Sequence, residues 1–214
     1  MFEDLLYLPL DIETAPRDCL HKLNDVDFRK ARRDDYRNCW QIQLMDRING
    51  EFKWTPLAKE KGFKSLIDWA EDCVFPLLGR SRVVIIATPH GTANYPHIDC
   101  SPQMFNTLQH KFRCVLQGNI DDLVFMSFDD EIYIEKTVDK PFIMSGRWPH
   151  HMLNSSTDTK FTFAFGAPWD GNLSNKTYFD MLKRSHMMYN EYYITSKNIE
   201  LPREYEKYYE NKYK

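Results

Sequence analysis

Short apolar runs separated by turn-forming residues fill the chain from residue 82 to residue 166. Runs rich in Val, Ile, Phe and Tyr are typical of β-strands when Gly, Pro, Asn or Asp stand between them. Eight segments fit this description: VVIIAT (83–88), YPHID (95–99), TLQHKFRCVLQ (107–117), LVFMSF (123–128), EIYIEK (131–136), PFIMSG (141–146), HHMLNSS (150–156) and KFTFAFG (160–166). This spacing predicts a mainly β fold with flanking helices, closed into a double-stranded β-helix, the cupin-like jelly roll.

The last of these runs alternates strictly between apolar and other residues. Phe161, Phe163 and Phe165 alternate with Lys160 and Thr162. Because successive side chains of a strand point to opposite faces, one face of this strand is apolar and the other carries Lys160.

A helical period marks the segment KSLIDWAEDCVFPLL, before the predicted strands. Its apolar residues recur at spacings of three and four, which indicates one buried helical face that we expect to lie against the sheet. Ser65 is a candidate N-cap, and Pro76 is expected to end or kink the helix. The charge-dense run at 27–40 is typical of a solvated helix face or loop.

At 214 residues the chain is long enough for one sizeable core, so we expect a single domain, 1–214. We divide it into an N-terminal helical segment packing on the sheet (1–80), a jelly-roll catalytic core (82–169) and a C-terminal helical tail (170–214). The tail is rich in Tyr, Glu and Lys, and its aromatic rings are a reasonable place for a homodimer contact.

Composition and charge limit the classes of partner and the cellular compartment that we expect. The formal net charge of −3 favours neither nucleic acid nor an anionic membrane surface as a partner. The first residues lack a basic, apolar leader pattern, and no window approaches the length of a membrane-spanning helix. Five widely spaced cysteines are typical of reduced thiols. We therefore expect a cytoplasmic protein.

Two metal-binding side chains stand one residue apart in YPHID. On a strand, His97 and Asp99 would project from the same face. A histidine pair at His150 and His151 opens a later strand, and Lys160 follows ten residues after His150. Two histidines and one carboxylate can occupy one face of an octahedral Fe(II) and leave three positions for a bidentate co-substrate and O₂. A buried lysine could then pair with the far carboxylate of a dicarboxylate co-substrate.

The order of these residues resembles a known family. His97-Ile98-Asp99, then the segment from His150 to Ser156, then Lys160 is similar to the motif of Fe(II)- and 2-oxoglutarate-dependent oxygenases. Within them it most resembles the aspartyl/asparaginyl β-hydroxylase-like group and the free-proline hydroxylases, although these typically have arginine at the position of Lys160. The resemblance covers about residues 82 to 169 and implies a jelly-roll fold.

The resemblance also implies a set of roles. Fe(II) would be held by His97, Asp99 and His150, and Lys160 would hold 2-oxoglutarate. The expected activity is that of a dioxygenase that uses O₂ to hydroxylate an amino acid, a peptide or another small substrate. The alternative is a non-catalytic, cupin-like module that binds a metal or ligand with the same residues.

Three assignments stay open at the level of sequence. His151 competes with His150 as the third ligand, but only His150 has the matching offsets to Asn154 and Lys160. Arg113 is the preferred second residue for 2-oxoglutarate, with competitors on the same predicted strand: Gln109, His110 and Lys111. Four residues are candidate substrate contacts at the rim of the barrel: Asn94, Tyr95, Arg147 and Trp148.

Overall fold

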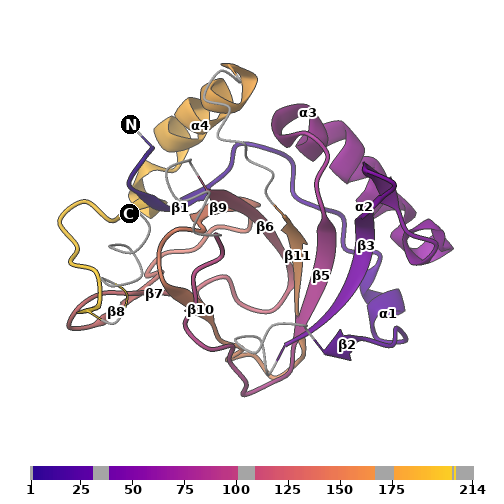
Figure 1. The fold of residues 1–214 in the computed structure, drawn as a ribbon, viewed down its shortest axis with the longest axis horizontal. Helices are drawn as coiled ribbons and strands as arrows, with labels where there is room; N and C mark the ends of the chain where they lie inside the picture. The colour runs from indigo at the N-terminus through magenta and orange to yellow at the C-terminus, as the bar shows by residue number, and fades with distance from the viewer. Residues whose placement is uncertain (1, 31–38, 101–108, 167–175, 204, 206–214) are drawn as a thin grey trace.

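Antiparallel strands in two sheets form the body of the molecule, and helices gather outside the larger sheet (Figure 1). This computed structural model describes residues 2–30, 39–100, 109–166, 176–203 and 205. The mainly β fold with flanking helices agrees with the prediction.

The larger sheet has nine strands in the order β12-β1-β9-β6-β11-β5-β3-β2, with β4 beside β3. Its strands, in chain order, are β1 (Leu5–Pro9), β2 (Arg29–Lys30), β3 (Trp40–Ile48), β4 (Glu51–Trp54), β5 (Val83–Thr88), β6 (His110–Gln117), β9 (Phe142–Ser145), β11 (Lys160–Phe165) and β12 (Ile194–Thr195). Strands far apart in sequence therefore lie side by side, and β11 pairs with both β5 and β6.

The smaller sheet has three strands in the order β10-β7-β8. They are β7 (Leu123–Met126), β8 (Glu131–Tyr133) and β10 (His150–Met152). Viewed end-on, the two sheets curve around a common interior, with β10 and β7 facing the middle strands of the larger sheet (Figure 1). This arrangement is the predicted jelly roll.

The larger sheet has an apolar core on each side. We call the side that carries the helices its outer face and the side toward the smaller sheet its inner face. On the outer face, the Trp69 ring lies 6.1 Å from the Phe112 ring and 6.2 Å from the Phe163 ring. On the inner face, the Tyr7 and Phe142 rings are 5.1 Å apart in a second cluster that includes residues of β7.

The helix predicted in KSLIDWAEDCVFPLL is present, but its middle is wider than an α-helix. It consists of α2 (Lys64–Trp69), a π-helical stretch (Ala70–Val74) and α3 (Phe75–Leu78). Ser65 does not cap it: its hydroxyl is hydrogen-bonded to Asp18. Pro76 stands in the first turn of α3, where its missing N–H costs little, and the helix ends at Gly79 with φ of 72°.

The first 80 residues differ from the predicted helical segment because they also supply strands β1 to β4. Helix α1 (Leu20–Leu23) is only one turn long. β3 and β4 form a hairpin joined by Asn49 and Gly50, whose φ angles are 52° and 87°. Asn-Gly with positive φ at both positions is a strong hairpin signal, so the sequence contained the information.

Several predicted strands are shorter in the structure, and one is absent. YPHID forms no strand: only an isolated bridge joins His97 to His150. Pro96 has no N–H to give to a ladder, which explains the irregular backbone there. Of the other segments discussed above, residues 101–108, most of the charged run (31–38) and the end of the tail (206–214) lie outside the described residues. Residues 167–175 also lie outside the described residues, and the described part of the tail starts with helix α4 (Lys176–Met188).

Candidate metal centre

Three predicted ligands meet between the two sheets. His97 and Asp99 lie on the segment after β5, and His150 is the first residue of β10. One ligand atom from each residue lies within 4.8 Å of the other two. The structure therefore brings together residues that are separated by about fifty positions in the chain.

Backbone hydrogen bonds fix the positions of all three ligands. The His97 amide donates to the His150 carbonyl over 2.9 Å, and the His150 amide donates to the His97 carbonyl over 3.0 Å. The Asp99 amide donates to the Gly146 carbonyl over 2.9 Å. The H-x-D motif thus needs no continuous strand, because β10 and the residues just before it hold it in place.

A backbone carbonyl two residues earlier in the chain orients each histidine ring. Nδ1 of His97 donates to the carbonyl of Tyr95, and Nδ1 of His150 donates to the carbonyl of Trp148, both over 2.8 Å. A carbonyl can only accept, so Nδ1 carries the proton and Nε2 is the ligand atom. Both Nε2 atoms turn toward the Asp99 carboxylate, at 3.6 Å from His97 and 3.9 Å from His150. This arrangement is typical of metal-ligating histidines.

The charges around the centre favour its metal-binding form. Burial alone would raise the pKa of Asp99, but His97 and then Arg113 outweigh it and hold the pKa far below its usual range. Burial is the largest cause that lowers the pKa of His150, to about 3. A charged Asp99 carboxylate and a neutral His150 imidazole are the forms in which these two residues bind a cation.

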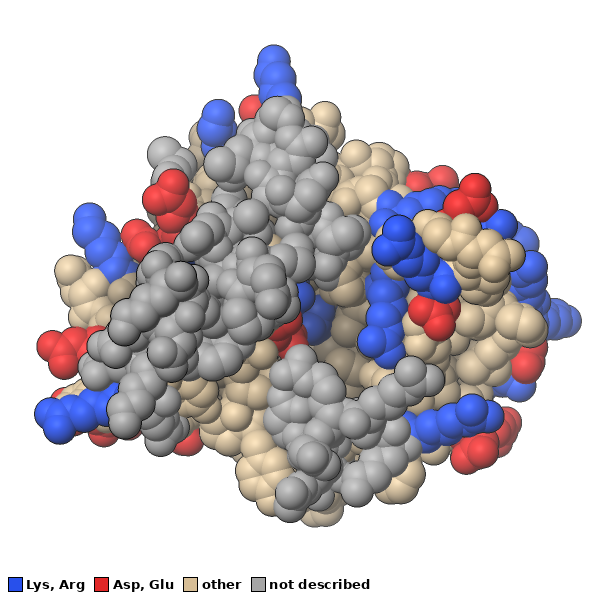
Figure 2. Space-filling view, in the orientation of Figure 1, with Lys and Arg blue, Asp and Glu red and all other residues tan. Residues whose placement is uncertain are grey.

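Two imidazole nitrogens and one carboxylate fit Fe(II). The donor set is that of a facial triad, which leaves positions on the ion for other molecules. His97, Asp99 and His150 are at most 8% exposed as side chains, so the ion would lie in a largely dry site. Figure 2 shows a hollow in the middle of this face of the molecule, with charged side chains of both signs in it.

Lys160 stands at the start of β11 and is fully buried. Its ammonium donates to the carbonyl of Asn119 and lies 3.4 Å from a carboxylate oxygen of Asp122. Gly118, with φ of 97°, packs so closely on Lys160 that a side chain there would clash with it. Burial lowers the pKa of Lys160 to about 8, although the charge of Asp122 raises it.

Arg113 lies on the inner face of the sheet, next to a metal ligand. Its guanidinium donates to the Asp99 carboxylate over 3.0 Å and to the carbonyls of Phe112 and Phe165. The structure thus shows it orienting Asp99, while its predicted contact with 2-oxoglutarate stays a prediction. Its competitor His110 is on the outer face, bonded to Tyr178 and to the carbonyl of Phe2.

The choice between the two adjacent histidines follows from their directions. His150 faces Asp99, whereas Nε2 of His151 lies 3.3 Å from the Glu131 carboxylate on β8. The Asn154 side-chain amide donates to the carbonyls of Thr88 and Asp158, so this residue has a structural role after β10. His150 is therefore the third member of the cluster.

Three of the four predicted substrate contacts form side-chain hydrogen bonds within the chain. The Asn94 side chain accepts the Met152 amide proton over 2.5 Å. The Trp148 indole donates to the Met126 carbonyl, and Arg147 donates to the Glu3 carbonyl. Tyr95 is 51% exposed, which leaves its ring accessible. Their contact with a substrate stays a prediction.

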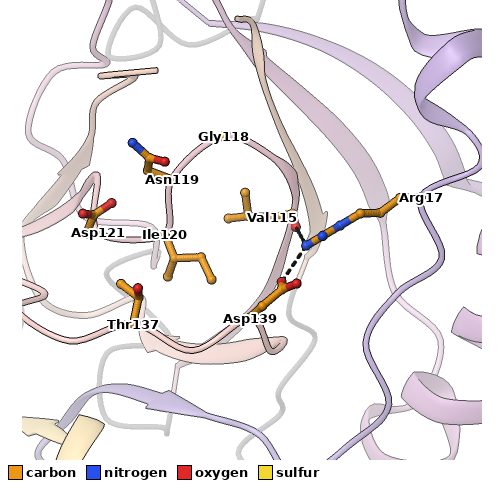
Figure 3. Close-up of a pocket in the computed structure, with 8 residues that line it drawn as sticks. All are labelled: Arg17, Val115, Gly118, Asn119, Ile120, Asp121, Thr137 and Asp139. Carbon is orange, nitrogen blue, oxygen red and sulfur yellow. Dashed lines mark hydrogen bonds and ion pairs between the residues drawn. The ribbon is translucent and has the colours of Figure 1, made fainter. Parts of the chain in front are cut away.

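A separate cavity of about 310 Å³ lies beside the loop that follows β6 (Figure 3). Arg17 lies at one side of it and reaches Asp139 and the carbonyl of Val115. Asn119, whose carbonyl holds Lys160, also lines this cavity. Neither Asn119 nor Asp122 was selected from the sequence, because a single polar residue in a turn carries no signal of its distant partner.

Comparison with known proteins supports the fold. A prolyl hydroxylase from Trichoplax adhaerens, solved with a hypoxia inducible factor peptide fragment, is similar to this chain with a TM-score of 0.53 at 12% identity. The match covers 80% of this chain and 87% of that one. A Pseudomonas putida prolyl-4-hydroxylase matches with a TM-score of 0.48 at 13% identity, over 78% and 95% of the two chains. The fold assignment rests on the first.

The other comparisons do not show a family for this chain. An oxidoreductase of the 2OG-Fe(II) oxygenase family from Burkholderia pseudomallei matches with a TM-score of 0.44 at 10% identity, over 69% of this chain and 79% of that one. No family model and no curated protein matches the sequence. The closer kinship with aspartyl/asparaginyl β-hydroxylase-like proteins is not confirmed and stays a prediction.

Among the described residues, no helix has both the length and the apolar character needed to cross a membrane.

Proposed function

We propose that this chain is an Fe(II)- and 2-oxoglutarate-dependent oxygenase that hydroxylates an amino acid, a peptide or another small substrate. One observation carries the proposal: two histidines, each with Nδ1 donating to the carbonyl two residues before it, turn Nε2 toward one buried carboxylate inside a jelly roll. A facial triad in this fold supplies the metal donors that such chemistry needs, and Lys160 adds a buried cation.

The residues have distinct tasks in this proposal. His97, Asp99 and His150 would hold Fe(II), and Lys160 would pair with the far carboxylate of 2-oxoglutarate. Iron with its co-substrate and O₂ supplies the oxidising power that inserts oxygen into a C–H bond. Arg113 donates to Oδ2 of Asp99, so it would hold the carboxylate of this ligand in place.

The protein's further contribution is to exclude water from the reacting centre. The Phe125 ring lies 6.3 Å from the His150 ring, and Phe125 is fully buried. Apolar side chains of the inner cluster therefore line the space beside the ligands. A dry site strengthens the electrostatic interactions within it and protects reactive species from side reactions.

For the substrate, a peptide or amino acid is favoured by the similar hydroxylase that was solved with a peptide fragment. Tyr95 offers an exposed ring at the segment that carries His97, and we propose it as the first substrate contact to test. Asn94, Arg147 and Trp148 would act through shape, because their polar groups are already hydrogen-bonded within the chain.

The test is anaerobic addition of Fe(II) and 2-oxoglutarate to metal-free protein, followed by visible absorption. A charge-transfer band from the metal-bound keto acid is expected in the wild type. His150→Gln should weaken metal binding by more than about 100-fold, since even indirect partners of a ligand can have effects of that size. His151→Gln is the matched control and should keep the band.

Two outcomes would contradict the proposal. Folded, iron-loaded protein without the band would favour the non-catalytic metal- or ligand-binding module. Equal losses in His150→Gln and His151→Gln would contradict the assignment of the third ligand. Where the wild type shows the band, Asp99→Ala should abolish it.

A further inference from the structure

The buried ammonium of Lys160 already has a carboxylate beside it. Asp122, on the loop between β6 and β7, is 5% exposed, and its Oδ2 lies 3.4 Å from Nζ of Lys160. The carbonyl of Asn119, on the same loop, accepts a second hydrogen bond from the ammonium. Two of the three donors of Lys160 are thus directed to one loop.

Asp122 is itself held by the segment after β10. The amide of Ser155 donates to Oδ2 of Asp122 over 3.2 Å, and the amide of Leu153 donates to the Asp122 carbonyl over 2.8 Å. Since β10 also carries His150, the same stretch of chain positions both a metal ligand and the partner of Lys160. The carboxylate is therefore a fixed part of the site.

A buried lysine without a counter-charge tends to lose its proton, because burial disfavours the charged form. Neutral lysine cannot pair with a carboxylate, so an uncompensated Lys160 would be a poor partner for 2-oxoglutarate. The 3.4 Å separation is longer than the 2.7–2.9 Å typical of charge-assisted hydrogen bonds, so the ammonium can also turn toward another acceptor.

We propose that Asp122 is a positioning residue that keeps Lys160 charged and in place for the far carboxylate of 2-oxoglutarate. This inference rests on the proposed function. Besides Asp122, the titratable groups that act on Lys160 are Asp121, on the same loop, and Cys39, just before β3. Asp121 is exposed, whereas Asp122 is buried and in contact.

The inference predicts how co-substrate binding depends on pH. The pKa of Lys160 is about 8, with burial lowering it and Asp122 raising it. In the wild type, binding of 2-oxoglutarate should weaken as pH rises above this value. In Asp122→Asn this weakening should begin at least one pH unit lower, so that affinity at pH 8 falls about fivefold or more.

The experiment measures the dissociation constant of 2-oxoglutarate for Fe(II)-loaded protein without O₂, from pH 6 to pH 9. We expect Asp122→Asn to bind within about threefold of wild type at pH 6, because Lys160 is protonated again there. A variant that was only misfolded would not recover at low pH. Asp121→Asn removes the same charge from the exposed neighbouring residue and should shift the curve much less than Asp122→Asn does.

Two further variants sharpen the test. Lys160→Arg has a side chain that stays charged, so adding Asp122→Asn to it should not shift the pH dependence. If Asp122→Asn does not fold, Asp122→Ser offers a smaller acceptor for the Ser155 amide and should show the same shift.

The outcomes separate the two proposals. Identical pH curves for wild type and Asp122→Asn, or equal shifts in Asp121→Asn and Asp122→Asn, would overturn the role of Asp122. Wild-type protein that binds iron but no 2-oxoglutarate at any pH would overturn the proposed function, and the role of Asp122 with it.

Discussion

The outer and inner faces of the larger sheet differ most clearly on β11. Its outward side chains, Phe161, Phe163 and Phe165, belong to the apolar core beneath the helices. Its inward side chains begin with Lys160, which is just as buried but charged. The same six residues therefore contribute an aromatic core to one side and a buried charge to the other.

The outer face mainly stabilises the fold, whereas the inner face carries the charged groups of the proposed site. Aromatic packing on the outer face lowers the free energy of the folded state through buried apolar area. The inner face instead buries Asp99, Arg113 and Lys160, whose desolvation opposes folding unless each charge has a partner. Substitutions on the two faces should therefore respond differently to a metal ion.

The largest effect is expected from Phe163→Ala on the outer face. Phe163 is fully buried against Trp69, so its loss should lower the free energy of unfolding by about 3–5 kcal/mol. Urea unfolding measures this, and added Fe(II) should stabilise the variant and the wild type equally. Met187→Ala is the control, because Met187 is 80% exposed and its loss should cost less than about 0.5 kcal/mol.

On the inner face, Arg113→Met should destabilise the metal-free protein by about 3 kcal/mol, because it leaves the buried Asp99 carboxylate without its cation. Fe(II) should recover more stability in this variant than in the wild type, since the ion replaces the lost charge. Thermal unfolding with and without metal measures both effects. Equal recovery in the two proteins would contradict the pairing, and a second substitution, Asp99→Asn, should restore the metal-free stability.

His110 is the polar exception on the outer face, and it predicts a dependence of stability on pH. Burial lowers its pKa from 6.5 to about 4, so between these values the unfolded chain takes up a proton that the folded chain does not. Stability should fall as pH drops through this window, by up to about 3 kcal/mol, with no further loss from His110 below pH 4.

Urea unfolding of the wild type and His110→Gln at pH 7, 5.5 and 4 isolates this contribution. The variant should lose less stability than the wild type across the window. His150 also has a lowered pKa, so part of the acid sensitivity should remain in both proteins. Parallel curves would contradict the role of His110.

The smallest effect is expected at Tyr7, the phenol in the inner cluster. Its buried hydroxyl has no hydrogen-bond partner among the residues that the structure describes. Tyr7→Phe should therefore leave stability unchanged or raise it by about 1 kcal/mol. Tyr178→Phe removes a hydroxyl that is bonded to His110 and should lower stability by about the same amount. Similar losses in both variants would mean that the Tyr7 hydroxyl has a partner.

The jelly roll and the metal cluster could be predicted because both depend on local patterns. Alternation in KFTFAFG identified β11 and its two faces, and the offset from His150 to Lys160 separated His150 from His151. Each of these signals lies within a few residues of chain. Only the pairing of H-x-D with His150 required a contact across fifty residues, and the resemblance to a known motif supplied it.

The remaining features depend on contacts that no local pattern encodes. Asp122 is one of many acidic residues in the sequence until β11 places Lys160 beside it. The YPHID segment alternates like a strand, yet Pro96 removes a backbone donor and leaves a single bridge. The β3–β4 hairpin was not predicted, because residues 1–80 were interpreted as helical, although Asn49-Gly50 is a hairpin signal.

The reciprocal hydrogen bonds between the His97 and His150 backbones have a kinetic consequence. They close a small ring that joins the segment after β5 to β10 through backbone groups alone. An arriving ion would therefore meet two imidazoles that are already spaced, and its capture would not wait for a loop to fold. The rates of metal entry and release would then be set by water exchange on the ion and by rotation of the Asp99 carboxylate. Slow deuterium exchange of the His97 and His150 amides in metal-free protein would be the signature of this preformed pair.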